Sequence, residues 1–159
     1  MKIRILPVSL IPAALFLAMA AVASQPAARS ADDEKLVTIT ANDSLKFSVT
    51  EIDASPGQKI HVRFTNEGTL PKDGMGHNWI LLDSEAEANT YATTAMSARN
   101  VEYQPKSQSS HVLAFIPLLG PKEVGDVSFC APTKPGKYPY ICSCSGHSLA
   151  GMKGVLIVK

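Results

Sequence analysis

From Leu36 onward, hydrophobic and polar residues alternate with a period of two in several short runs. Alternation puts every second side chain on one face of an extended strand, so the pattern predicts half-buried β-strands. Turn-forming residues rich in Pro, Gly and Asn separate the runs, and short strands at this spacing predict an all-β Greek-key sandwich. The apolar positions of the runs are Leu45, Phe47 and Val49; Ile60, Val62 and Phe64; Val112, Ala114 and Ile116; Val127 and Phe129; Tyr138 and Tyr140; and Val155 and Ile157.

One stretch, residues 84–99, departs from the period of two. Ser84 followed by Glu87 has the spacing of a capping box at the start of a helix. Behind it, apolar residues recur at helical spacing. We therefore expect one short helix over about residues 84–99, inserted between strands and packed on the flank of the sandwich. Its apolar positions are Ala88, Tyr91 or Ala92, and Ala95 or Met96.

The strands that follow the inserted helix suggest one local pairing. Residues 127–130 and 138–142 both alternate, and the segment 132–136 between them contains Pro132 and Gly136. Two alternating runs joined by such a turn predict a β-hairpin.

The first residues have the pattern of a targeting segment. Lys2 and Arg4 precede an apolar run over residues 5–22, and Ala21-Val22-Ala23 has the small-x-small pattern of a cleavage site. This predicts a secretory signal peptide over residues 1–23, cleaved near Ala23, and hence a periplasmic protein. The alternative is a retained membrane anchor, because the run is nearly long enough to span a bilayer. Residues 24–35 are interpreted as a flexible leader, and residues 36–159 as the folded domain.

The net charge of the chain excludes one class of function. The chain contains fifteen Lys and Arg residues and fourteen Asp and Glu residues, which gives a formal net charge of +1. Loss of residues 1–23 would leave 13 basic residues against 14 acidic ones, a net charge of −1. Nucleic-acid binders usually carry a concentrated basic excess, so this class is excluded, and near neutrality also makes electrostatic steering of partners weak.

The residues that carry chemistry lie near the C-terminus and in one distant segment. Two thiols, an imidazole and a thioether occur within residues 142–152, and a second imidazole occurs far upstream in Gly76-His77-Asn78-Trp79. Two His and one Cys with a weak axial Met form the ligand set of a blue copper electron-transfer site. Zinc is a poorer match, because Met is not among its usual ligands. The C-terminal candidates are Cys142, Cys144, His147 and Met152.

These segments resemble those of a known family. Residues 70–81, LPKDGMGHNWIL, resemble the first copper-ligand region of azurin. Residues 142–154 resemble the ligand loop of azurins and, more closely, that of auracyanins. The chain is thus similar to the cupredoxin (type 1 blue copper) family over residues 36–159. The resemblance implies one copper ion with His77, Cys142 and His147 in its plane, Met152 as a weak axial ligand and the Gly76 carbonyl as a second axial neighbour.

The choice between the two loop thiols rests on spacing and on side-chain direction. Cys142 stands at the azurin-like distance from His147, whereas Cys144 stands at the distance found in plastocyanin. Tyr138, Tyr140 and Cys142 alternate, so Cys142 points into the sandwich with the two aromatic residues. We therefore interpret Cys142 as the ligand and Cys144 as a loop thiol close to the metal. The resemblance also implies that Asn78 braces the ligand loop by hydrogen bonding.

These interpretations predict an electron-transfer protein rather than an enzyme. It would shuttle single electrons between redox proteins by Cu(I)/Cu(II) cycling, as a monomer. Partners would dock on an apolar patch around His147. The alternative is a copper delivery or storage protein that uses the same ligands. The patch is expected to comprise Met75, Leu119, Leu149 and Ala150.

Overall fold

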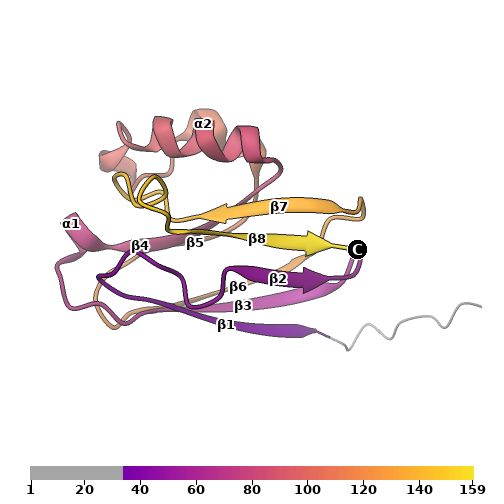
Figure 1. The fold of residues 1–159 in the computed structure, drawn as a ribbon. Helices are drawn as coiled ribbons and strands as arrows, with labels where there is room; N and C mark the ends of the chain where they lie inside the picture. The colour runs from indigo at the N-terminus through magenta and orange to yellow at the C-terminus, as the bar shows by residue number, and fades with distance from the viewer. Residues whose placement is uncertain (1–33) are drawn as a thin grey trace, which may run out of the picture.

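Two β-sheets packed face to face, with a helical insert on one outer face, make up the fold (Figure 1). The computed structural model describes residues 34–159. The expected signal peptide, residues 1–23, and most of the expected leader lie outside the described residues. The strands are β1 (Lys35–Ala41), β2 (Glu51–Ala54), β3 (Lys59–Asn66), β4 (His77–Leu82), β5 (Val112–Leu119), β6 (Val124–Cys130), β7 (Gly136–Ile141) and β8 (Lys153–Val158).

The order of the strands confirms the all-β sandwich. One sheet has three strands in the order β1-β3-β6, and the other has five in the order β2-β8-β7-β4-β5. The pairs β1–β3 and β2–β8 are parallel, and the remaining pairs are antiparallel. Successive strands therefore cross repeatedly from one sheet to the other, and the core lies between the sheets.

The core follows the predicted alternation in β3, whose Ile60, Val62 and Phe64 are fully buried. In β8 the prediction chose the wrong face, because Leu156 and Val158 are buried rather than Val155 and Ile157. The register explains the difference: Leu156 lies opposite the inward-facing Tyr138 of β7, and residues paired across two strands share a face.

The strand predicted between β1 and β2 is wrong. No strand forms on Leu45, Phe47 and Val49, where Phe47 makes only an isolated bridge to Ala41. Leu45 has a φ of 58° and its N–H donates to the carbonyl of Asn42 at 3.1 Å, so a turn replaces the extended chain. Phe47 is nevertheless buried.

The predicted hairpin over residues 127–142 is also absent. Strand β6 pairs with β3 in the three-stranded sheet, whereas β7 pairs with β4 and β8 in the other. The Pro-containing connection between β6 and β7 therefore crosses from one sheet to the other instead of turning back within one.

The inserted helix is confirmed, although it is shorter than expected. Helix α2 (Glu85–Ala95) begins after Ser84, whose Oγ accepts a hydrogen bond from the Glu87 N–H at 3.3 Å. It ends four residues before Arg99, and two 3-10 helices follow, η1 (Arg99–Val101) and η2 (Lys106–His111). In Figure 1, α2 lies over β7 and β4 on the outer face of the five-stranded sheet. This cover explains why β4 is buried on both faces.

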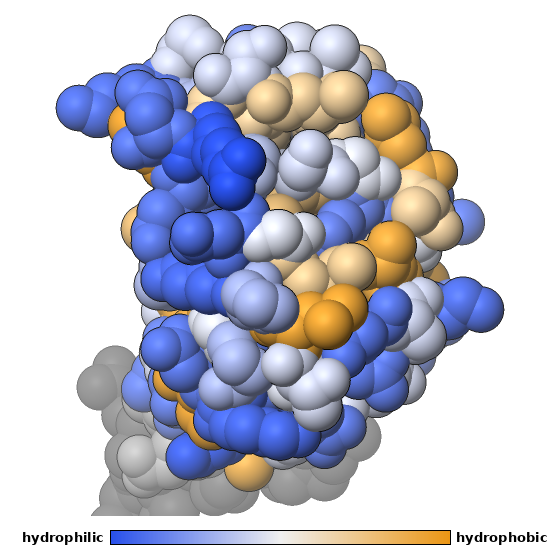
Figure 2. Space-filling view, turned by 90° about the vertical axis from the view of Figure 1, so that its left-hand side faces the viewer, coloured by the Kyte–Doolittle hydropathy of each residue, from blue (hydrophilic) through white to orange (hydrophobic). Residues whose placement is uncertain are grey.

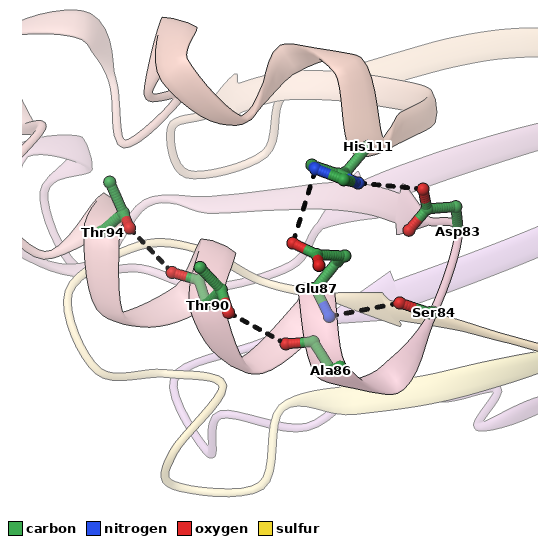
Figure 3. A network of polar contacts seen from close by, with 7 residues as sticks. All are labelled: Asp83, Ser84, Ala86, Glu87, Thr90, Thr94 and His111. Atoms are coloured by element: carbon green, nitrogen blue, oxygen red, sulfur yellow. Dashed lines mark hydrogen bonds and ion pairs between the residues drawn. The ribbon is translucent and has the colours of Figure 1, made fainter.

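The two remaining histidines of the fold are surface residues with acidic neighbours. His61 contacts Ser128 and Asp126 on the outer face of the three-stranded sheet. His111 lies between Asp83 and Glu87, which come from the end of β4 and the first turn of α2 (Figure 3). Among residues 34–159, no helix is both long enough and apolar enough to cross a lipid bilayer.

Candidate metal centre

The antiparallel pairing of β4 with β7 brings the two distant chemical segments together. Ile80 of β4 lies opposite Ile141 of β7. Continuing this register by two residues puts Asn78 opposite Ser143, and hydrogen bonds join the side chain of Asn78 to the side chain and the backbone N–H of Ser143. His77, the first residue of β4, and Cys142, which follows β7, therefore lie next to each other although 65 residues separate them.

Three donor atoms converge at this place. The Sγ of Cys142 lies 4.0 Å from Nδ1 of His77 and 3.5 Å from Nδ1 of His147. The ligand atoms of these three residues all lie within 4.8 Å of one another, and all three residues are buried. In the described part of the chain, no other group of three His, Cys, Asp or Glu side chains gathers in this way.

The loop from β7 to β8 places the fourth candidate beside the three donors. The Cys142 N–H donates to the carbonyl of Met152 at 3.1 Å, and the Met152 N–H donates to the carbonyl of His147 at 2.9 Å. Gly146 and Gly151 have φ angles of 77° and 100°, a region that a side chain disfavours. Two glycines thus allow the loop to fold back so that the fully buried Met152 adjoins both Cys142 and His147.

Asn78 joins the two ligand segments by a pair of hydrogen bonds. Its Nδ2 donates to Ser143 Oγ at 2.8 Å, and its Oδ1 accepts the Ser143 N–H at 2.7 Å. Ser143 Oγ also donates to the carbonyl of Tyr103, at 2.7 Å. Sequence reasoning missed Ser143 and Tyr103, and only the register of β4 against β7 would have pointed to Ser143.

Burial controls the protonation of the donors. Desolvation and, to a lesser extent, the charge of His77 lower the pKa of His147 to about 4. Desolvation also lowers the pKa of His77. Burial raises the pKa of Cys142 to about 12, against the N–H groups of Asn78 and Cys144, which lower it. At neutral pH both imidazoles are therefore uncharged, with lone pairs free to bind a cation, and the thiol releases its proton only when a cation takes its place.

The donor set selects the type of metal. It has two imidazole nitrogens, one thiol sulfur and an adjacent thioether, with no carboxylate in the cluster. Hard cations such as Mg²⁺ and Ca²⁺ prefer oxygen ligands, whereas sulfur with imidazole suits copper. The adjacent Met152 favours copper over zinc for the same reason. The residues present thus fit one copper ion.

Cys144 lies outside this cluster. Its side chain is fully buried, and burial raises the pKa of its thiol, against the N–H of Ser145 and the hydroxyl of Tyr103, which lower it. Cys130 is exposed at the end of β6, and the three cysteines of the described chain are all free thiols.

Gly76, the residue before His77, is buried where no side chain fits. A Cβ there would lie 2.7 Å from the carbonyl oxygen of Lys72 and 2.9 Å from Cγ of Leu118. The glycine therefore lets helix α1 (Lys72–Met75) approach β5 closely just before the first candidate ligand.

The expected apolar patch is present only in part. Leu149 is 67% exposed, Ala150 is exposed and Met75 is half-buried. The inclusion of Leu119 was wrong, because it is only 6% exposed: it lies opposite His77 in the β4–β5 pair and packs in the core. Figure 2 shows this end of the molecule, where apolar surface gathers near the middle with polar residues around it.

Comparisons with known proteins agree with this geometry. The sequence model described as "copper binding proteins, plastocyanin/azurin family" matches residues 34–159. Auracyanin-B of Chloroflexus aurantiacus is 34% identical over 119 residues, which cover 74% of this chain and 49% of the relative. The chain thus spans about half the length of that protein. An azurin of Pseudomonas fluorescens biotype C is 32% identical over 126 residues, covering 77% of this chain and 97% of the azurin.

Solved structures give the same result. A crystal structure of dithionite-reduced auracyanin from the photosynthetic bacterium Roseiflexus castenholzii superposes with a TM-score of 0.70 at 28% identity. The match covers 79% of this chain and 97% of that one.

Proposed function

This chain belongs to the plastocyanin/azurin family of copper-binding proteins and its cofactor is one copper ion, and from that premise we propose that it carries single electrons between redox proteins. The observation that carries the proposal is the convergence of His77, Cys142 and His147 in a buried cluster. When bound, copper supplies a one-electron couple between Cu(I) and Cu(II). The chain would act as a carrier, with no catalytic residue of its own.

The protein's part is to hold the donors in one arrangement. The two strands that flank the cluster are joined by Asn78 and Ser143, and Met152 is tied to Cys142 and His147 by backbone hydrogen bonds. Ligands fixed in this way move little when the charge of a bound ion changes, which keeps the barrier to electron transfer low.

The burial of the donors favours electron transfer over copper delivery or storage. His77 and Cys142 are fully buried, and His147 is only 4% exposed. A protein that hands copper to a partner needs the partner's ligands to reach the ion. Here an incoming ligand would meet packed side chains first, so an electron would pass more readily than the ion.

His147 is the donor nearest to solvent, and we place the docking surface around it. We define the docking patch as Met75, Leu149 and Ala150, the exposed or half-buried members of the expected set. The nearly neutral chain offers little electrostatic steering, and weak redox encounters use small interfaces. Desolvation of the patch would therefore supply much of the attraction between partners. We also propose that the protein is exported to the periplasm, on the signal pattern of residues 1–23.

Redox titration tests the electron-carrier function. With one equivalent of copper, the protein should develop an intense visible absorption that a mild reductant removes and an oxidant restores through many cycles. The delivery alternative predicts weak colour and rapid loss of copper to a chelator, and that result would contradict the carrier function.

The docking patch is tested by electron self-exchange between oxidised and reduced copies of the protein. Leu149→Glu should slow self-exchange by about tenfold or more, since two patches must meet and each would then carry an unpaired charge. Leu36→Glu is the matched control, because Leu36 is 63% exposed on β1 and lies outside the patch. Equal rates for the two variants would show that copies do not meet through Leu149.

A further inference from the structure

We propose that a groove on the flank of the sandwich binds a small organic carboxylate with an apolar body. The groove lies between strands β5 and β6 and the insert, residues 83–111, and its volume is about 640 Å³. We call it the flank groove. Small-molecule sites usually have volumes of about 300–1,000 Å³. No copper ligand and no member of the docking patch lines this groove, so the inference goes beyond the proposed function.

The flank groove exists because two strand edges adjoin here. Strand β5 is the outermost strand of the five-stranded sheet, and β6 is the outermost strand of the three-stranded sheet. Among residues 34–159, neither strand has a partner on its outer side, and the two strands lie next to each other. The insert runs alongside them and forms the remaining wall, with residues of α2, η1 and η2. The opening therefore follows from the order of the strands.

The strand walls of the groove are apolar. Leu113 and Phe115 of β5 are exposed, and Val127 and Phe129 of β6 are half-buried. Val101 of the insert adds a further exposed apolar side chain. Large contiguous apolar patches are rare on monomeric proteins and usually mark a site of binding. These side chains offer contact to an alkyl or aryl body.

The insert wall contains a buried hydroxyl without a partner. Tyr91 of α2 is only 2% exposed and lines the groove. Its hydroxyl makes no hydrogen bond to any of residues 34–159, and burial alone raises its pKa, to about 12. The hydroxyls of Tyr138 and Tyr140 instead donate to backbone carbonyls at 2.8 and 2.7 Å, as buried tyrosines usually do. The Tyr91 phenol therefore stays protonated at neutral pH and can donate to a ligand in the groove.

Two further donors stand on the insert wall. Gln104 is half-buried, and its side-chain amide makes no hydrogen bond within the described chain. Lys106 is exposed, and no carboxylate of residues 34–159 lies within ion-pair distance of its Nζ. No Asp or Glu lines the groove. The groove thus combines one positive charge and neutral donors with apolar walls, which complements a carboxylate attached to an apolar body.

An extended peptide that adds to the edge of β5 fits the groove less well. Only residues 112–115 of β5 line it, which is a short stretch for strand pairing. Pro117 follows two residues later in the same strand, and a proline has no N–H for a ladder of hydrogen bonds. A small carboxylate is therefore the better match.

The test uses decanoate as the probe and decanol, which has the same chain length without the charge, as the matched comparison. Both are titrated into the reduced, copper-loaded protein, and the backbone amide chemical shifts are followed by NMR. We expect decanoate to bind at one site, with shifts that change along residues 112–115 and 127–129 rather than around Leu149. We expect decanol to bind about tenfold more weakly or worse, since it lacks the charge that Lys106 complements.

Three variants assign the contacts. Lys106→Gln and Tyr91→Phe should each weaken decanoate binding about fivefold or more, because each removes one donor to the carboxylate. Phe115→Ser should weaken decanoate and decanol alike, because it removes apolar contact. Lys46→Gln is the matched control and should leave both affinities unchanged. Lys46 is also exposed, forms no ion pair within the described chain and lies outside the groove.

The titrations also define what would overturn the proposal. Equal affinities for decanoate and decanol, unchanged in Lys106→Gln, would show apolar binding without selection for a carboxylate. Shift changes confined to the docking patch would place the ligand there instead. No binding of decanoate would rule the proposal out. Binding only to vesicles of anionic phospholipid, or only to a hexapeptide of alternating valine and threonine, would replace the carboxylate by a membrane surface or an added strand.

The copper function is read out separately in the same samples. The visible absorption and the reversible copper couple should be the same in all four variants, because none of the substituted residues belongs to the copper cluster. Failure of decanoate to bind would therefore leave the carrier function intact. Absence of a reversible couple in the unsubstituted protein would count against the carrier function and leave the decanoate result unaffected.

Discussion

His111 holds three elements together through two carboxylates. Its Nδ1 lies 3.0 Å from Asp83 Oδ2, and its Nε2 lies 3.5 Å from Glu87 Oε2 (Figure 3). The hydrogen bond to Asp83 raises the pKa of His111 by more than desolvation lowers it, and the charges of Glu87 and Asp83 raise the pKa further. The residue joins the ends of β4 and η2 to the first turn of α2.

This arrangement predicts a pH-dependent contribution to stability. A histidine whose pKa is higher in the folded than in the unfolded protein stabilises fully below its unfolded pKa, near 6.5. The contribution is lost as pH rises through the folded pKa. The difference in free energy of unfolding between the unsubstituted protein and His111→Gln should therefore shrink between about pH 6 and pH 8. His77 and His147 cancel in this difference, because both variants contain them. A difference that stays constant or grows over this range would contradict the prediction.

Single residues also show what a sequence alone leaves open. The Cys-His-Met spacing identified the donors from chemistry and resemblance, because few other arrangements combine these side chains. The sequence predicts Leu119 at the surface because it is apolar and near the ligands, yet the β4–β5 register buries it. Exposure of an apolar residue depends on strand pairing, which a pattern of single residues does not specify.

Among the secondary-structure elements, β7 and β8 pack without room for a larger side chain. A Cβ at Gly154 would overlap the ring and hydroxyl of Tyr140, which lies opposite it in the register. Tyr140 is fully buried, and its hydroxyl donates to the carbonyl of Val49 at 2.7 Å, so the ring has little freedom to move.

Gly154→Ala should therefore destabilise the protein by about 1–3 kcal/mol, as overpacked cores generally do. The measurement is chemical denaturation followed by circular dichroism. Gly74→Ala is the control, because no heavy atom lies within 4 Å of its added Cβ, and it should leave the free energy of unfolding unchanged within about 0.5 kcal/mol. Equal stabilities of the two variants would mean that the β7–β8 contact is looser than described.

The strands also show how much of the secondary structure the sequence predicts. Alternation located β3, β5 and β7, because each presents one apolar face to the core. It failed at Leu45, where a left-handed turn interrupts the run, and at the supposed hairpin between β6 and β7. Period two describes a strand's faces but not its partner, so a crossing between sheets and a turn within one sheet look alike in the sequence.

At the scale of the whole molecule, the sandwich brings together two short segments that the chain keeps far apart. His77 begins a central strand, Cys142 follows its antiparallel neighbour, and the loop that carries His147 and Met152 closes over the same end. The convergence depends on the order β7-β4-β5 in one sheet. The sequence supplied the donors, and the topology explains why they meet.

The most direct test of this account compares Cys142→Ser with Cys144→Ser after addition of one equivalent of copper. Only Cys142 shares the cluster with both histidines, and a copper–thiolate bond is the source of intense visible absorption in such sites. We predict that Cys142→Ser lacks this absorption and that Cys144→Ser retains it at comparable strength. Full colour in Cys142→Ser together with its loss in Cys144→Ser would contradict the site described here.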